Sequence, residues 1–177
     1  MTKNSIPWVK KQSITIVPVG AVGSEPEALR NILEAFNWRV DIIWIASRKE
    51  FMKVLDGTIK TADYVVIPNH GCDKGIIVPD EEYVTPEDIA EVGKLAGKTI
   101  ISTGCTTGRK VYGDAFIKKA KAKAYIAPIE YPAGNSALMF VARLFYELSN
   151  KKSLRTAVSV ARKLDKETAR FGTFQKT

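Results

Sequence analysis

Short apolar runs recur along the chain, and a polar or amphipathic stretch separates each run from the next. The runs are rich in β-branched residues and cover residues 13–19, 40–46, 62–68, 98–103 and 124–129. Apolar runs of this length without polar alternation are typical of strands buried on both faces of a parallel sheet. The pattern therefore predicts five strands, with a shorter extended piece at residues 76–78.

The stretches between these runs carry helix signals. Ser24 and Glu27 have the spacing of a capping box around Pro26, and Ser47 is placed to cap a second helix. Thr85 precedes a proline and predicts the start of a third helix. Apolar residues at helical spacing then predict helices over residues 24–37, 47–57, 85–97, 112–122, 136–149 and 154–165.

This alternation predicts an α/β fold, with a mainly parallel sheet of about five or six strands and helices on both faces. In such sheets a ligand binds beyond the carboxyl ends of the strands, near the switch in strand order. His70 follows the third predicted strand and Cys105 follows the fourth. Both are therefore expected at the edge of the sheet where ligands bind.

The length of 177 residues predicts a single domain over 1–177, with a core at about 13–165. The arm 1–12 and the tail 166–177 are expected to be loose. No apolar run reaches the roughly 20 residues that cross a bilayer. The polar start of the chain and its two cysteines favour a cytoplasmic, reducing setting, in which a thiol stays available.

Charge is unevenly distributed. Residues 1–108 carry 12 Lys and Arg against 14 Asp and Glu, whereas residues 109–177 carry 15 against 5, a net charge of +10. Such asymmetry is found on surfaces that bind nucleic acid or acidic partners, and also on ordinary solvated helix faces. No aromatic residue interrupts the lysine cluster at 118–123, so nucleic acid is not the favoured partner.

Cys105 and His70 together suggest nucleophilic chemistry. A thiol attacks as the thiolate, and a nearby imidazole can take its proton. His70 is the only histidine, and Gly71 and Gly104 leave room for the backbone to approach a substrate carbonyl. The alternatives are an inert buried thiol and a loop histidine without a role.

Other cysteine and loop motifs do not fit residues 100–108. A cysteine-phosphatase loop requires an arginine where this chain has Val111. A P-loop requires a wider glycine spacing followed by Gly-Lys-Ser/Thr, but Arg109 follows Gly108 here. A nucleophile elbow has glycines where Thr103 and Thr107 stand. All three motifs are disfavoured.

Two further alternatives involve the residues around His70. A zinc site could draw on His70, Cys72, Asp73 and Cys105, although the chain has no Cys-x-x-Cys pair. Cys72 and Cys105 could also form a redox pair. Asp73 is otherwise a solvated turn residue or an acidic wall of a substrate pocket.

The motifs also resemble a known family. An apolar strand leads into His70-Gly71, an extended segment follows, and residues 85–89 start a helix. A second apolar strand then ends in a Cys-x-Thr-Gly loop at 105–108. This order resembles the caspase-like cysteine peptidases, and within them the CHAT branch, which is related to separase. The resemblance covers about residues 13–165.

The resemblance implies a three-layer caspase-like fold and a cysteine endopeptidase without a cofactor. It implies that His70 is the general base, that Cys105 is the nucleophile, and that the backbone N–H groups of Gly71 and Cys105 form the oxyanion hole. Relatives select substrates through pocket charges, for which Asp73 and Arg109 are the candidates. The expected partner is a peptide or protein substrate, with a homodimer or an activating protein completing the groove.

The alternative is a catalytically silent caspase-like module. Its basic C-terminal half would then bind an acidic partner.

Overall fold

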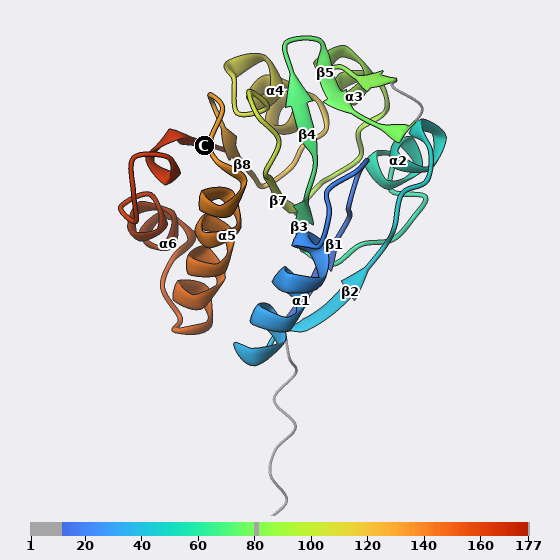
Figure 1. Ribbon diagram of the computed structural model, residues 1–177. Coiled ribbons are helices and arrows are strands. Elements are labelled where there is room, and N and C mark those ends of the chain that lie inside the picture. Colours follow the sequence, from blue (N-terminus) through green and yellow to red (C-terminus); the bar gives the residue numbers. More distant parts are fainter. Residues whose placement is uncertain (1–11, 80–81, 177) are drawn as a thin grey trace, which may run out of the picture.

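A computed structural model describes residues 12–79 and 82–176 (Figure 1). Its main sheet has six strands in the order β2-β1-β3-β7-β8-β9. These strands are β1 (Ser13–Ile16), β2 (Arg39–Ile42), β3 (Tyr64–Ile67), β7 (Thr99–Ser102), β8 (Ala124–Pro128) and β9 (Phe171–Gln175). All pairs are parallel except β8 with β9. The predicted mainly parallel sheet is confirmed.

Helices cover both faces of this sheet (Figure 1). One face packs against α1 (Glu25–Ala35), α5 (Gly134–Ser149) and α6 (Leu154–Ala161), and the other against α2 (Arg48–Leu55), α3 (Pro86–Val92) and α4 (Lys110–Asp114). Alternate residues of β3 enter the two cores: Val65 and Ile67 pack on the α2 side and Val66 on the α1 side. This double burial explains why the strands read as continuous apolar runs. The three-layer arrangement is confirmed.

A second sheet lies beyond the carboxyl end of β3. It is antiparallel and consists of β4 (His70–Cys72), β5 (Gly75–Ile77) and β6 (Tyr83–Val84). His70 therefore begins a short hairpin rather than a plain loop, and the predicted extended piece is the second strand of that hairpin.

Two of the three predicted helix caps form. The Ser47 hydroxyl accepts a hydrogen bond from the Glu50 N–H, and Thr85 forms a reciprocal capping box with Asp88. The capping box predicted at Ser24 is wrong, because Ser24 has φ −90° and ψ 9° and its side chain caps nothing. That backbone is not the extended conformation from which an N-cap oxygen reaches the first turn.

Three predicted helices also differ in their bounds from the structure. The last of them, predicted over 154–165, ends at Ala161. The third helix ends at Val92, well before Gly97, because Gly93 turns to extended backbone. The helix predicted at 112–122 begins at Lys110 and continues as a π-helical turn over Ala115–Lys119.

The tail is the main correction to the predicted fold. The sequence predicts a loose tail over 166–177, but the described part of it contains a 3₁₀ turn at Thr168–Arg170 and strand β9. Phe171 is fully buried and stacks on Phe140 with ring centroids 3.8 Å apart. The burial of this aromatic side chain holds the segment on the sheet. The predicted loose arm at 1–12 lies almost wholly outside the described residues.

No helix in the described ranges is both long enough and apolar enough to span a bilayer.

Replacing Phe171 by alanine tests the corrected tail. We expect Phe171→Ala to lower the free energy of unfolding by about 3–5 kcal/mol, because it leaves a cavity beside Phe140. Gln175→Ala, at an exposed position of the same strand, is the matched control and should change it by less than about 0.5 kcal/mol. Urea unfolding measures both. Equal, small losses would mean that the tail is not packed.

Candidate active site

The structure brings the His70 and Cys105 segments into backbone contact. β3 and β7 are parallel neighbours, and Ile67 is in register with Ser102, so each segment starts at the same edge of the sheet. A Cβ atom on Gly71 would collide with the carbonyl oxygen of Cys105. Glycine is therefore required here by a close approach, and the two loops pack as one unit.

The imidazole of His70 is exposed and is held from one side. Its Nε2 atom lies 3.0 Å from the carbonyl oxygen of Ala21, in the loop after β1. A carbonyl oxygen can only accept, so Nε2 donates and neutral His70 keeps the lone pair of Nδ1 free. Within residues 12–79 and 82–176, no hydrogen bond joins this ring to the Cys105 thiol. The Nδ1 atom of the neutral ring is thus available to accept a proton.

Cys105 is half-buried, and this burial raises the pKa of its thiol above the ordinary value. A hydrogen bond with its own backbone acts in the opposite direction but is the weaker effect. The thiol is therefore protonated at neutral pH in the resting protein. A thiolate at Cys105 is therefore not favoured before a substrate binds.

Asn69 links the two segments through its buried side chain. Its Oδ1 atom accepts hydrogen bonds from the Ser102 hydroxyl (2.7 Å) and the Gly104 N–H (3.2 Å). Its Nδ2 atom donates to the carbonyl oxygen of His70 at 3.2 Å. A Cβ atom on Gly104 would collide with the same amide group. The sequence prediction does not include this role, although a polar residue directly before the only histidine is a usable signal.

The loop that carries Cys105 is fixed at several further points. The Thr107 hydroxyl donates to the carbonyl oxygen of Gly104 (2.7 Å), and the buried Tyr125 hydroxyl donates to that of Thr107 (2.8 Å). Thr106, next to the cysteine, has φ 60°, in the left-handed region that β-branched residues rarely adopt. A strained residue beside a candidate nucleophile is common at functional sites.

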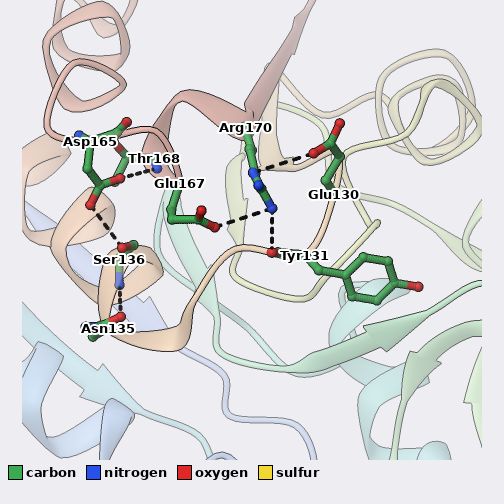
Figure 2. Close-up of polar contacts among 8 residues, drawn as sticks. All are labelled: Glu130, Tyr131, Asn135, Ser136, Asp165, Glu167, Thr168 and Arg170. Atoms are coloured by element: carbon green, nitrogen blue, oxygen red, sulfur yellow. Dashed lines mark hydrogen bonds and ion pairs between the residues drawn. The ribbon is translucent and has the colours of Figure 1, made fainter.

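A second loop, residues 129–133, lies against the Cys105 loop. The Thr106 N–H donates to the carbonyl oxygen of Glu130 at 3.0 Å. Arg170 holds this loop from the tail: it donates to the carbonyl oxygen of Tyr131 (2.8 Å) and lies near the carboxylates of Glu130 (3.5 Å) and Glu167 (3.3 Å), as Figure 2 shows. The tail thus supports one wall of the site.

Glu25, at the start of α1, is a second residue near the site that the sequence does not predict. Burial raises the pKa of its carboxyl group, while a hydrogen bond with the Thr103 side chain and the charge of His70 act in the opposite direction. Its Oε1 atom is buried and has no hydrogen-bond partner among the described residues. A costly buried acid therefore lies within electrostatic reach of the imidazole.

The side chains of Asp73 and Arg109 form an ion pair with each other. The Arg109 guanidinium donates to the Asp73 carboxylate at 2.7 Å, and both side chains are exposed. The pair ties the turn between β4 and β5 to the end of the Cys105 loop. Their role in a substrate pocket stays a prediction.

Neither the zinc site nor the Cys72–Cys105 redox pair is supported by the structure. Both cysteines are free thiols. In the described ranges, no group of three or more His, Cys, Asp and Glu side chains is arranged to hold a metal ion.

Comparison with known proteins identifies the fold. No family model and no curated protein matches the sequence. Among solved structures, the Saccharomyces cerevisiae separase–securin complex matches with a TM-score of 0.60 and 15% identity, over 93% of this chain and 12% of the matched chain. The caspase drICE matches with a TM-score of 0.56 and 12% identity, over 94% of this chain and 88% of its own. The chain therefore has the caspase-like fold, as the resemblance implied; identities this low carry the fold alone.

The neutral state of Cys105 predicts a particular pH dependence of alkylation. In a Cys72→Ser background, we expect the rate of reaction with iodoacetamide to rise with pH and to have its midpoint above that of an ordinary thiol, because burial raises the Cys105 pKa. Stopped alkylation followed by intact-mass spectrometry measures the rate. A plateau of high reactivity in mildly acidic solution would instead reveal a preformed ion pair.

Glu25 predicts a pH-dependent change in stability. Its pKa is raised on folding, so the unfolded chain loses the proton first and the free energy of unfolding falls as pH rises between the two pKa values. Glu25→Gln removes this penalty, and we expect a higher melting temperature at pH well above the folded pKa. The gain should vanish in acid, below the ordinary pKa of glutamate. Glu27→Gln, at an exposed position one residue beyond Pro26, is the control. A constant gain at every pH would contradict the assignment.

Proposed function

We propose that this caspase-like chain is a cysteine endopeptidase, with Cys105 as the nucleophile and His70 as the general base. The observation that carries the proposal is the contact of the Gly71 and Cys105 backbones, beside an imidazole whose Nδ1 is left unprotonated by the bond to Ala21. The caspase-like fold supports a peptidase-type module.

In the proposed reaction, Cys105 starts as the thiol and His70 starts as the neutral imidazole. Cys105 Sγ bonds to the carbonyl carbon of the substrate as its proton passes to His70 Nδ1, and the carbonyl oxygen becomes an oxyanion. The N–H groups of Gly71 and Cys105 donate to that oxyanion. The two-residue turn after Cys72 makes Cys72–Gly75 the hydrogen-bonded pair of the hairpin, so the N–H of Gly71 points away from β5.

Collapse of this intermediate breaks the carbon–nitrogen bond, and the imidazolium gives its proton to the leaving amine. A water molecule then attacks the thioester while His70 takes one of its protons, and the acid product leaves with Cys105 restored as a thiol. His70 is positively charged during each step. The nearby carboxylate of Glu25 stabilises that charge, because the two groups interact favourably.

A peptidyl acyloxymethyl ketone tests the dyad, because its reaction requires an activated thiol at a carbonyl-like centre. We expect the probe to label Cys105, and we expect His70→Ala to slow labelling about a hundredfold or more, the usual contribution of a general base. Peptide mapping identifies the labelled residue, and the time course gives the rate.

Iodoacetamide is the matched control reagent. Its rate should change little in His70→Ala if the loop keeps its structure, because simple alkylation depends on the thiolate alone. Equal ketone labelling in the variant, with Cys72 modified as fast as Cys105, would refute the proposed dyad.

A further inference from the structure

A groove of about 610 Å³ lies between α6 and β9, the last strand of the main sheet. Its polar lining comes from Arg155, Ser159, Arg162, Lys163, Thr173 and Gln175. No carboxylate lines it. The lining is therefore net cationic, and an anionic occupant would be favoured electrostatically.

The α6 wall is a cationic stripe. Arg155, Ser159 and Arg162 follow one another at i, i+4 and i+7 and therefore share one face of the helix. Among residues 12–79 and 82–176, Arg155 and Lys163 have no ion-pair partner, and the guanidinium of Arg162 donates only to the carbonyl oxygen of Ala169 (3.1 Å). The charges of the stripe are thus free to meet a ligand.

The nearest acids are engaged elsewhere. Asp165 accepts hydrogen bonds from the Ser136 hydroxyl (3.0 Å) and the Thr168 N–H, and Glu167 pairs with Arg170 (Figure 2). Both carboxylates therefore serve the junction of the tail with α5 and the 129–133 loop. They do not neutralise the stripe.

The opposite wall is the open edge of the sheet. β9 is the last strand in the sheet order, so no described strand pairs with its outer side. Hydrogen bonds join Ile129 to Arg170 and Lys176 to Lys123, which fixes the alternation along the β8–β9 ladder. Along β9, residues that hydrogen-bond to β8 alternate with residues that do not. Thr173 and Gln175 are of the second kind, so their backbone N–H and C=O groups point away from β8. These are the groups that a further strand would bind.

We propose that this groove binds an extended acidic segment of a partner protein, which adds as a strand to β9 and places acidic side chains beneath the α6 stripe. Strand addition satisfies the free backbone groups of Thr173 and Gln175, and the stripe supplies specificity through charge. A second copy of this chain is the poorer occupant, because two cationic stripes would meet. The proposal does not depend on peptidase activity.

The test uses a short fluorescein-labelled peptide of alternating Glu and Val, with binding followed by fluorescence anisotropy. We expect one-to-one binding that weakens with added salt. The double variant Arg155→Glu with Arg162→Glu should weaken binding about tenfold or more. Lys119→Glu with Lys152→Glu changes the net charge equally at exposed positions outside the groove, and it should leave the affinity within about twofold.

The edge is tested separately. Thr173→Pro removes an N–H that β8 does not use, a position where edge strands tolerate proline, and we expect it to weaken binding about tenfold. Thr173→Val keeps that N–H and should bind normally. Circular dichroism checks the fold of each variant. If the proline variant is unfolded, an N-methylated version of the peptide replaces it and should fail to bind.

Several outcomes would overturn the proposal. Equal losses in both charge-reversal pairs would mean a general charge effect, and equal binding by the proline and valine variants would rule out strand addition. Tighter binding of a single-stranded oligonucleotide of matched charge would assign the groove to nucleic acid. Self-association abolished by Thr173→Pro would assign the edge to a second copy of the chain.

Discussion

The contact between Gly71 and the backbone of Cys105 is the constraint on which the candidate site depends. Parallel pairing of β3 with β7 brings the two segments to the same edge, but only the missing side chain lets them touch. Asn69 then fills the space between them and bonds to both sides. The relative placement of the His70 and Cys105 segments is therefore set by backbone packing.

Most of the fold could be predicted from sequence because its signals are local. Buried parallel strands are continuous apolar runs, and Thr85 and Ser47 mark helix starts through hydrogen bonds that reach only three residues. β9 is not predicted because Phe171–Gln175 is short and contains a glycine. Its stability comes from β8 and Phe140, which are distant in sequence. The cap predicted at Ser24 is wrong because capping requires a backbone conformation that the residue type alone does not determine. The backbone of Ser24 keeps its hydroxyl from capping the helix.

The residues of the candidate site also differ in whether local sequence signals predict them. His70 and Cys105 could be placed at the same edge of the sheet from sequence, because each follows a recognisable strand. Glu25 could not, because its proximity to His70 depends on how α1 packs beside the carboxyl end of the sheet. Its burial costs stability, while its charge favours the imidazolium that the proposed reaction requires. Functional sites often trade stability for activity in this way.

The contact of Arg170 with the 129–133 loop implies an order in which this part of the structure forms. It follows Tyr131, whose carbonyl oxygen it binds, by 39 residues, and it reaches that loop only once the 3₁₀ turn and β9 have docked on β8. A ribosome releases the chain from its N-terminus, so the dyad and the 129–133 loop emerge before the residue that holds this wall in place. A nascent chain would therefore carry His70 and Cys105 before the 129–133 loop is fixed, and the synthesis of the tail would complete this part of the structure.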